Sequence, residues 1–272
     1  MRALLASPLG FLIGLSLGAL GGGGSILAVP VLVYVAGQDA KAATATSLVL
    51  VGMTALVGIG PHLRAGRVRL KAGVLFGAAG VAGAVAGSRL NEQVDPDVLL
   101  LGFSGVMLLA AAAMFRSARK RRAALAAAAG GAAAGAGAVL QLTAVRADAR
   151  TIVRVLLAGT GVGILTGFFG VGGGFVIVPA LVLALGFTMP EAVGTSLVVI
   201  VINSAVSLIT RLGAGGVDWT VVVPFAVSSM AGVLVGGRLA GKKDPSSLQF
   251  AFVGLLVAVA LYTMTRSVIA LA

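Results

Sequence analysis

The chain of 272 residues has no cysteine, a single histidine and few charged side chains. Without cysteine there is no disulfide framework, no thiol nucleophile and no thiolate metal site. The histidine, His62, lies in a basic segment, and no carboxylate interrupts the middle of an apolar run. These absences leave an aspartyl dyad, a carboxylate metal site and a carboxylate proton relay unsupported. A phosphate-binding loop of the GxxxxGK[ST] kind is also missing. We predict no enzymatic activity, no cofactor and no metal.

Apolar residues dominate what is present. Hydrophobic residues make up 59% of the chain and charged residues 10%, and the mean hydropathy is +1.11. These values lie far outside the range of soluble globular domains. A membrane-spanning helix needs about 20 apolar residues. The apolar runs are Leu9–Val35, Thr44–Gly60, Ala72–Leu90, Val98–Phe115, Val153–Leu185, Thr195–Ile209, Val221–Leu239 and Leu248–Met264. The sequence predicts an all-α polytopic membrane protein of the cell inner (cytoplasmic) membrane.

The net charge of +12 is the one feature that could indicate a nucleic-acid partner. The positive charges gather in short loops between apolar runs, however, and such loops stay on the cytoplasmic side. We therefore expect His62–Lys71 and Arg116–Arg122 to be cytoplasmic, Asn91–Asp97 to face outward, and no nucleic acid to bind. Lys242 and Lys243 break this pattern if both halves of the chain have the same orientation. The expected partners are the lipid bilayer and a small ligand, and a homo-oligomer stays open.

A shift of 149 residues aligns Gly14–Gly105 with Gly163–Gly254 without a gap. Matching Gly-Gly, Thr-Ser, Arg-Leu and Asp-Pro pairs in one frame indicate a duplication, which apolar composition alone would not produce. We predict two homologous four-helix repeats, 1–117 and 151–272, joined by an Ala-rich basic linker, 118–150. The stretch Ala123–Val145 within it either lies on the membrane surface or forms a ninth span. Inverted repeats, common in transporters, need an odd number of crossings per unit, and the sequence leaves the orientation open.

A glycine cluster interrupts the first run of each repeat, as GGGGSILAVP from Gly21 and as GVGGGFVIVP from Gly170. The pieces on either side are each too short to span a membrane. We predict that the first helix of each repeat is broken there, as one broken crossing or as a re-entrant hairpin. The new helix start would point free amides and a positive dipole end at the break, which favours an anion. The alternative is that the glycines only permit tight packing. We prefer packing for Gly14, Gly18, Gly83 and Gly87.

In each repeat, a pair of hydroxyl residues follows the glycine cluster near the start of the next expected helix. These pairs, Thr46-Ser47 and Thr195-Ser196, extend the candidate site. Their alternative role is to cap or back-bond their own helix. Asn203 adds an amide within an apolar span, where it needs a partner. The predicted ligand contacts are Gly22, Gly23, Gly24, Ser25, Thr46, Ser47, Gly172, Gly173, Gly174, Thr195, Ser196 and Asn203. Arg89 and Arg238 coincide between the repeats and either attract an anion or anchor helix ends at the interface.

The segments LGALGGGGSILAVPVLVYVAG with AATATSL, and LTGFFGVGGGFVIVPALVLALG with EAVGTSL, resemble the sulfite exporter TauE/SafE family of membrane permeases. Gly22 and Ser25 depart slightly from the family pattern. The resemblance implies export of sulfur-containing anions such as sulfite or organosulfonates. Together with the amide-lined anion site, it predicts a secondary transporter of small anions. The alternatives are a non-transporting membrane scaffold subunit and a permease for a different small ion.

Overall fold

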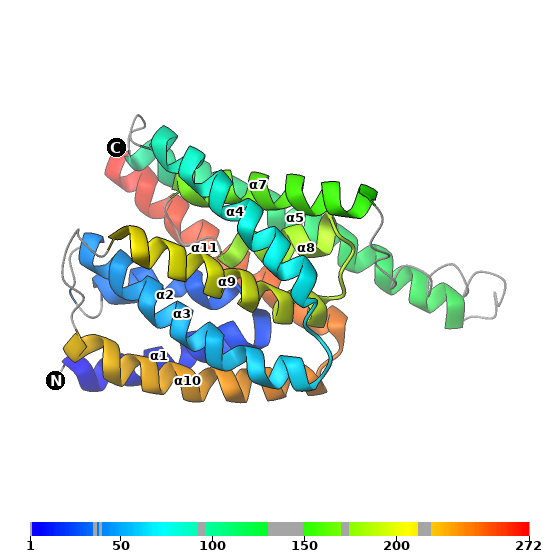
Figure 1. The fold of residues 1–272 in the computed structure, drawn as a ribbon, viewed down its shortest axis with the longest axis horizontal. Coiled ribbons are helices and arrows are strands. Elements are labelled where there is room, and N and C mark those ends of the chain that lie inside the picture. Colours follow the sequence, from blue (N-terminus) through cyan, green and yellow to red (C-terminus); the bar gives the residue numbers. More distant parts are fainter. Residues whose placement is uncertain are drawn as a thin grey trace.

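The computed structural model describes residues 2–34, 37, 40–91, 96–129, 149–169, 174–211 and 219–271. The helices are α1 (Arg2–Leu20), α2 (Gly23–Tyr34), α3 (Ala40–Arg64), α4 (Leu70–Asn91), α5 (Pro96–Ala129), α7 (Ala149–Phe169), α8 (Gly174–Leu183), α9 (Met189–Arg211), α10 (Trp219–Lys242) and α11 (Pro245–Leu271). Figure 1 shows them packed side by side, with the end of α5 projecting beyond the other helices.

Within the described part of the chain, six helices are long and apolar enough to cross a membrane. They are α3, α4, α5, α9, α10 and α11, while the apolar segments of α1, α7 and α8 are shorter. Each half of the chain thus supplies three full-length helices after its first, interrupted run. The prediction of an all-α polytopic membrane protein is confirmed.

The first apolar run is a re-entrant hairpin. α1 ends at Leu20, and Gly21 has a φ of 71°, a left-handed conformation that favours glycine. α2 then folds back, because a Cβ built on Gly24 would lie 2.7 Å from the Cβ of Leu17. A continuous helix would separate these two residues by about 10 Å. Of the two arrangements that the sequence allowed, this half adopts the hairpin.

The second half repeats the order of the first. It has two helices in contact, α7 and the short α8, followed by three helices long and apolar enough to span a membrane. Corresponding long helices start 149 residues apart, at Ala40 and Met189, at Leu70 and Trp219, and at Pro96 and Pro245. This spacing equals the shift that aligns the two halves of the sequence.

Corresponding helices run in opposite directions, as α3 and α9 illustrate. Gly52 of α3 faces the Ser204 side chain of α9, whereas Gly58, further along α3, faces Leu197, which comes earlier in α9. The contacts between α5 and α11 show that these two corresponding helices are also antiparallel. In its described residues, each half has three full-length helices, which is an odd number, and opposite directions are what an inverted repeat requires.

Two long seams hold the halves together, since α1 lies along α10 and α4 lies along α7 (Figure 1). A Cβ on Gly14 would overlap the backbone of Ser229 in α10. One on Gly18 would overlap the carbonyl oxygen of Val233, a turn further on. The register shows that α1 and α10 run in the same direction.

The seam between α4 and α7 has the same construction. A Cβ on Gly83 would overlap the carbonyl oxygen of Thr160, and one on Gly87 would overlap that of Ile164. Small residues let backbones approach closely where lipid supplies no hydrophobic drive for association. The packing role predicted for the four seam glycines, Gly14, Gly18, Gly83 and Gly87, is confirmed.

The basic segments gather at one end of the bundle. The turn of residues 65–69 joins α3 to α4 at this end, and a Cβ on Gly241 would lie 3.1 Å from the guanidinium of Arg67. Lys242 and Lys243 therefore lie at the same end as the first basic loop. Their conflict with the charge pattern disappears because the halves run in opposite directions. We refer to this end as the basic end.

The predicted linker is helical where it begins. α5 continues to Ala129, past residue 118 where the linker was expected to start. Residues 130–148, which hold most of the Ala-rich stretch, lie outside the described residues. The structure therefore does not bear on a ninth span there.

Candidate functional site

The two glycine breaks meet inside the bundle. Gly22, between α1 and α2, and Gly174, the first residue of α8, are both buried. A Cβ on Gly22 would overlap the carbonyl oxygen of Gly174, so the two backbones are in direct contact. A Cβ on Gly174 would in turn meet the Ser25 hydroxyl. Glycine at both positions allows two helix starts to approach one another. We refer to this meeting point as the hairpin tips.

The start of α2 leaves buried amides without a carbonyl partner in their own helix. The first turn of any α-helix has such unpaired N–H groups. The Ser25 amide donates to the carbonyl oxygen of Gly22 at 3.3 Å, a bond of one short turn. Gly23 and Gly24 precede it and are both buried. Buried amides need a partner from another segment, from water or from a ligand. The positive end of the helix dipole makes an anion a favourable one.

The four glycines of the first cluster do not have the same surroundings. A Cβ on Gly24 would lie 2.5 Å from the carbonyl oxygen of Ile13, so α1 occupies that side. At Gly23 the nearest atom is the Cδ2 of Leu255 in α11, at 2.8 Å. A leucine terminus can rotate away, whereas backbone cannot. Gly23 is therefore the position of the cluster with the most adaptable neighbour.

Two serine hydroxyls border the tips. Ser25 Oγ donates to the carbonyl oxygen of Gly22 at 2.7 Å, and Ser196 Oγ donates to that of Val193 at 2.8 Å. A Cβ on Gly21 would lie 2.6 Å from Ser196 Oγ, which places this hydroxyl directly beside the break. Both hydroxyls thus bond within their own turns, which is the local role considered as an alternative. Their oxygens still add polarity to the tips.

The other predicted hydroxyls are buried in their helices. Thr195 is 0% exposed, and its Oγ1 accepts a hydrogen bond from the Arg69 amide at 3.1 Å. That bond joins α9 to the start of α4. Thr46, at the equivalent repeat position, is also 0% exposed, and its hydroxyl has no partner among the described residues. Ser47 is buried as well.

The remaining candidates lie elsewhere or are not described. Gly172 and Gly173 lie outside the described residues. The Asn203 amide approaches Gly80 of α4, two turns along α9 from Ser196, and its Oδ1 has no described partner. Arg89 and Arg238 are exposed on α4 and α10. The structure brings together Gly22, Gly23, Gly24, Ser25, Gly174 and Ser196.

His62 belongs with the tips, although the sequence places it in a basic loop. It lies in α3 with 1% exposure, and its Nε2 is 3.1 Å from the carbonyl oxygen of Gly18. Gly18 is in the last turn of α1, where carbonyls lack partners in their own helix. His62 thus caps the helix that ends at the break. The expectation that this residue is part of a surface loop was wrong, because α3 continues to Arg64. In the sequence, the only hint that this residue is special was that it is the single histidine of the chain and directly follows Pro61.

Comparison with known proteins finds relatives that are named as probable membrane transporters. A "Probable membrane transporter protein" of Xylella fastidiosa (strain Temecula1 / ATCC 700964) is 34% identical over 269 residues, which cover 95% of this chain and 93% of the relative. The "Probable membrane transporter protein YdhB" of Bacillus subtilis (strain 168) is 25% identical over 235 residues, covering 84% and 86%. No solved structure matches the chain.

Long apolar helices, paired helix breaks and these relatives together define a polytopic membrane transporter. The family model described as sulfite exporter TauE/SafE matches residues 6–263. The chain belongs to the sulfite exporter TauE/SafE family.

Proposed function

We propose that the protein is a secondary transporter that exports small sulfur-containing anions, such as sulfite or organosulfonates, across the cytoplasmic membrane. The observation that carries this proposal is the buried contact between Gly22 and Gly174 at the starts of α2 and α8. Two helix N-termini meeting in the interior provide donors for an anion. Membership of the sulfite exporter family supports the choice of anion.

Binding relies on backbone amides. The residues at the tips are glycines and serines, so the positive potential there comes from helix dipoles and N–H groups. Glycine lets an oxyanion approach the backbone closely. Such a site suits a small, compact anion that must bind and then leave again. A lysine or arginine in the same place would hold the ion more tightly.

The energy source is a gradient. No ATP-binding loop is present in the sequence, and no carboxylate lies in the middle of an apolar run to carry a proton. A weakly acidic anion such as sulfite can carry its own proton, or the protein can let the anion move down its gradient. The basic end faces the cytoplasm, because positively charged loops are retained there.

Liposomes reconstituted with the purified protein provide the test. Flux of sulfite, thiosulfate, organosulfonates and simple carboxylates is measured against protein-free liposomes. We expect sulfite or a sulfonate to move fastest. Flux of none of these anions above the protein-free rate would contradict the proposal and favour a scaffold subunit. Faster flux of an unrelated ion would favour a different permease. An ordered anion between the tips in an experimental structure would support the site directly.

A further inference from the structure

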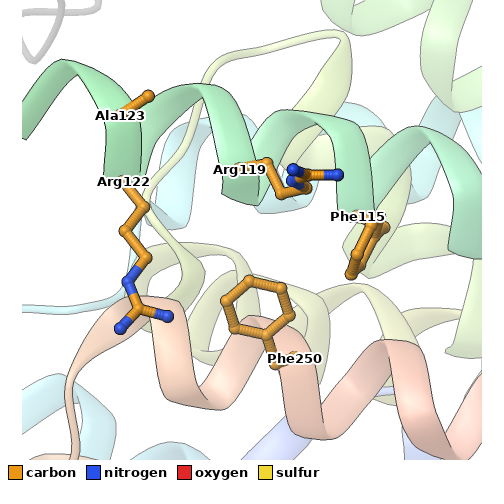
Figure 2. A pocket seen from close by; sticks show the side chains of 5 residues that line it. All are labelled: Phe115, Arg119, Arg122, Ala123 and Phe250. Carbon is orange, nitrogen blue, oxygen red and sulfur yellow. The ribbon is translucent and has the colours of Figure 1, made fainter.

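A cavity lies between α5 and α11, and its residues differ from those of the hairpin tips. Its volume is about 360 Å³, and it is lined by Phe115, Arg119, Arg122, Ala123 and Phe250. Figure 2 shows the two arginines and Phe115 along one helix, with Phe250 facing them from the other. We refer to it as the Arg-Phe pocket.

The spacing of these residues explains the pocket. Phe115, Arg119 and Arg122 are four and three residues apart, so they share one face of α5. α11 runs antiparallel alongside, and Gln249 Nε2 donates to the Met114 carbonyl oxygen at 3.0 Å. This bond fixes the two helices together beside the cavity.

The pocket combines an apolar wall with a cationic one. The Phe115 and Phe250 rings meet edge to face with centroids 5.8 Å apart. The guanidinium carbon of Arg119 lies 5.8 Å from the Phe115 ring centroid. Arg122 extends from α5 toward α11 beside Phe250 (Figure 2). A ligand that fills this space has an anionic group next to an apolar chain.

Among the residues that the structure describes, the two guanidinium groups have no carboxylate partner. Within the part of the chain that the structure describes, the ion pair is between Arg69 and Glu191, on α4 and α9. Arg119 and Arg122 are exposed and form no ion pair with a described carboxylate. Guanidinium groups in a fixed arrangement match the geometry of phosphate oxygens.

The pocket lies where α5 changes from apolar to charged residues. The apolar window of α5 runs from Leu101 to Ala124, and its charged residues begin at Arg116. Phe115 is 41% exposed and directly precedes this charged segment, so in a bilayer it would lie beside the upper part of the acyl chains. Anionic lipids are concentrated in the cytoplasmic leaflet, and basic pockets between helices on that side suit their headgroups.

We propose that the Arg-Phe pocket binds an anionic phospholipid. The phosphate sits on the guanidinium groups of Arg119 and Arg122, and the first part of an acyl chain lies against the two phenylalanine rings. A free inorganic anion would use the arginines but gain nothing from the rings. The amphipathic lining therefore favours the lipid over the transported anion.

The test uses the full-length protein in neutral detergent, titrated with dioctanoyl phosphatidylglycerol or dioctanoyl phosphatidylcholine and followed by native mass spectrometry. We expect phosphatidylglycerol to bind the wild type more tightly. The double variant Arg119→Gln/Arg122→Gln should weaken its binding about tenfold or more. The matched control is Arg116→Gln/Lys120→Gln, which removes the same charge from the same helix at exposed positions outside the pocket. It should change binding by about twofold at most.

Further measurements separate a lipid site from an ion site. Phe250→Leu should weaken phosphatidylglycerol binding, and millimolar inorganic phosphate should not displace the lipid from the wild type. Equal losses in the two double variants would overturn the proposal in favour of general surface charge. Displacement of the lipid by millimolar phosphate or sulfite would overturn it in favour of a free-ion site. The titrations with both lipids measure binding and not flux. Their results therefore do not depend on which anion the protein transports.

Discussion

Glycine has different roles at the two seams and at the hairpin tips. At the seams, as at Gly83 and Gly18, a Cβ would strike the carbonyl oxygen of a neighbouring helix. At the tips the reasons vary from one residue to the next. Gly21 needs its positive φ, Gly22 touches another backbone, and Gly23 faces mainly a flexible leucine. Replacing a seam glycine should therefore cost more stability than replacing Gly23.

The largest expected effect is at a seam. Gly83→Ala adds the one atom that overlaps Thr160 in α7. We expect it to lower the free energy of unfolding by about 3 kcal/mol, because neither backbone can move away cheaply. Thermal denaturation in detergent measures this loss. Flux per folded molecule should stay close to that of the wild type.

Gly105→Ala is the matched control for the seam variant. Gly105 is an exposed glycine of α5 with no atom within 4 Å of its Cβ position. Alanine there should leave stability unchanged or raise it by up to about 1 kcal/mol through helix propensity. If both variants lost stability equally, close packing would not explain the seam glycines.

The next effect concerns the tips. Gly23→Val should lower anion flux per folded molecule about tenfold or more, because a branched side chain blocks the approach of a ligand to amides that bind charge. Stability should fall less than for Gly83→Ala, because the nearest obstacle is the end of the Leu255 side chain. Gly172→Val makes the same change at the equivalent repeat position.

Anion flux in liposomes, divided by the amount of folded protein, is the measurement for both tip variants. Gly23→Ala provides an intermediate step in size. Wild-type flux from Gly23→Val and Gly172→Val combined would remove the breaks from the mechanism. The tip glycines would then differ from the seam glycines in geometry alone.

A smaller effect is expected at His62, which links the tips to α3. His62→Leu leaves the Gly18 carbonyl buried without its partner, at a cost of about 1–2 kcal/mol in stability. His62→Gln keeps an N–H donor and should recover part of the loss. The two variants are compared by thermal denaturation and by the KM and maximal rate of flux. Identical behaviour of Leu and Gln at this position would show that the hydrogen bond to α1 is unimportant.

The smallest effect lies outside both regions and sets a baseline. Glu191 Oε1 accepts from Arg69 at 2.7 Å, and Oε2 accepts from the Thr188 amide at 3.1 Å, just before α9. Arg69 is 44% exposed, so solvent screens the ion pair. Glu191→Gln should lower stability by less than about 1 kcal/mol. Thermal denaturation at low and high salt tests this, since the difference from wild type should shrink as salt rises. An unchanged difference would point to the capping bonds instead.

Much of the fold follows from periodicity and repetition. The apolar runs located the long helices, and the glycine clusters located the breaks after Leu20 and before Gly174. The shift of 149 residues also predicted which helices begin at equivalent positions. These features depend on local composition, which one sequence displays fully.

What the sequence left open depends on contacts between distant segments. Nothing in the runs themselves distinguishes a broken crossing from a hairpin, because that depends on Gly24 packing on α1. Asn203 was grouped with the tips by residue type, yet it lies beside Gly80 of α4. His62 was assigned to a loop because charged neighbours masked the end of α3. In each case the decisive partner is far away in the sequence.

The opposite directions of the two halves bear on how flux is directed. α1 enters the bundle from the end opposite the one from which α7 enters (Figure 1). The two halves therefore present equivalent helices toward opposite ends of the bundle. The repeat arrangement alone therefore gives the fold no preferred direction, and the export that we propose would depend on the gradient that is imposed. Differences in affinity between the two faces must then come from unmatched repeat positions, such as Ser25 opposite Gly174 and His62 opposite Arg211.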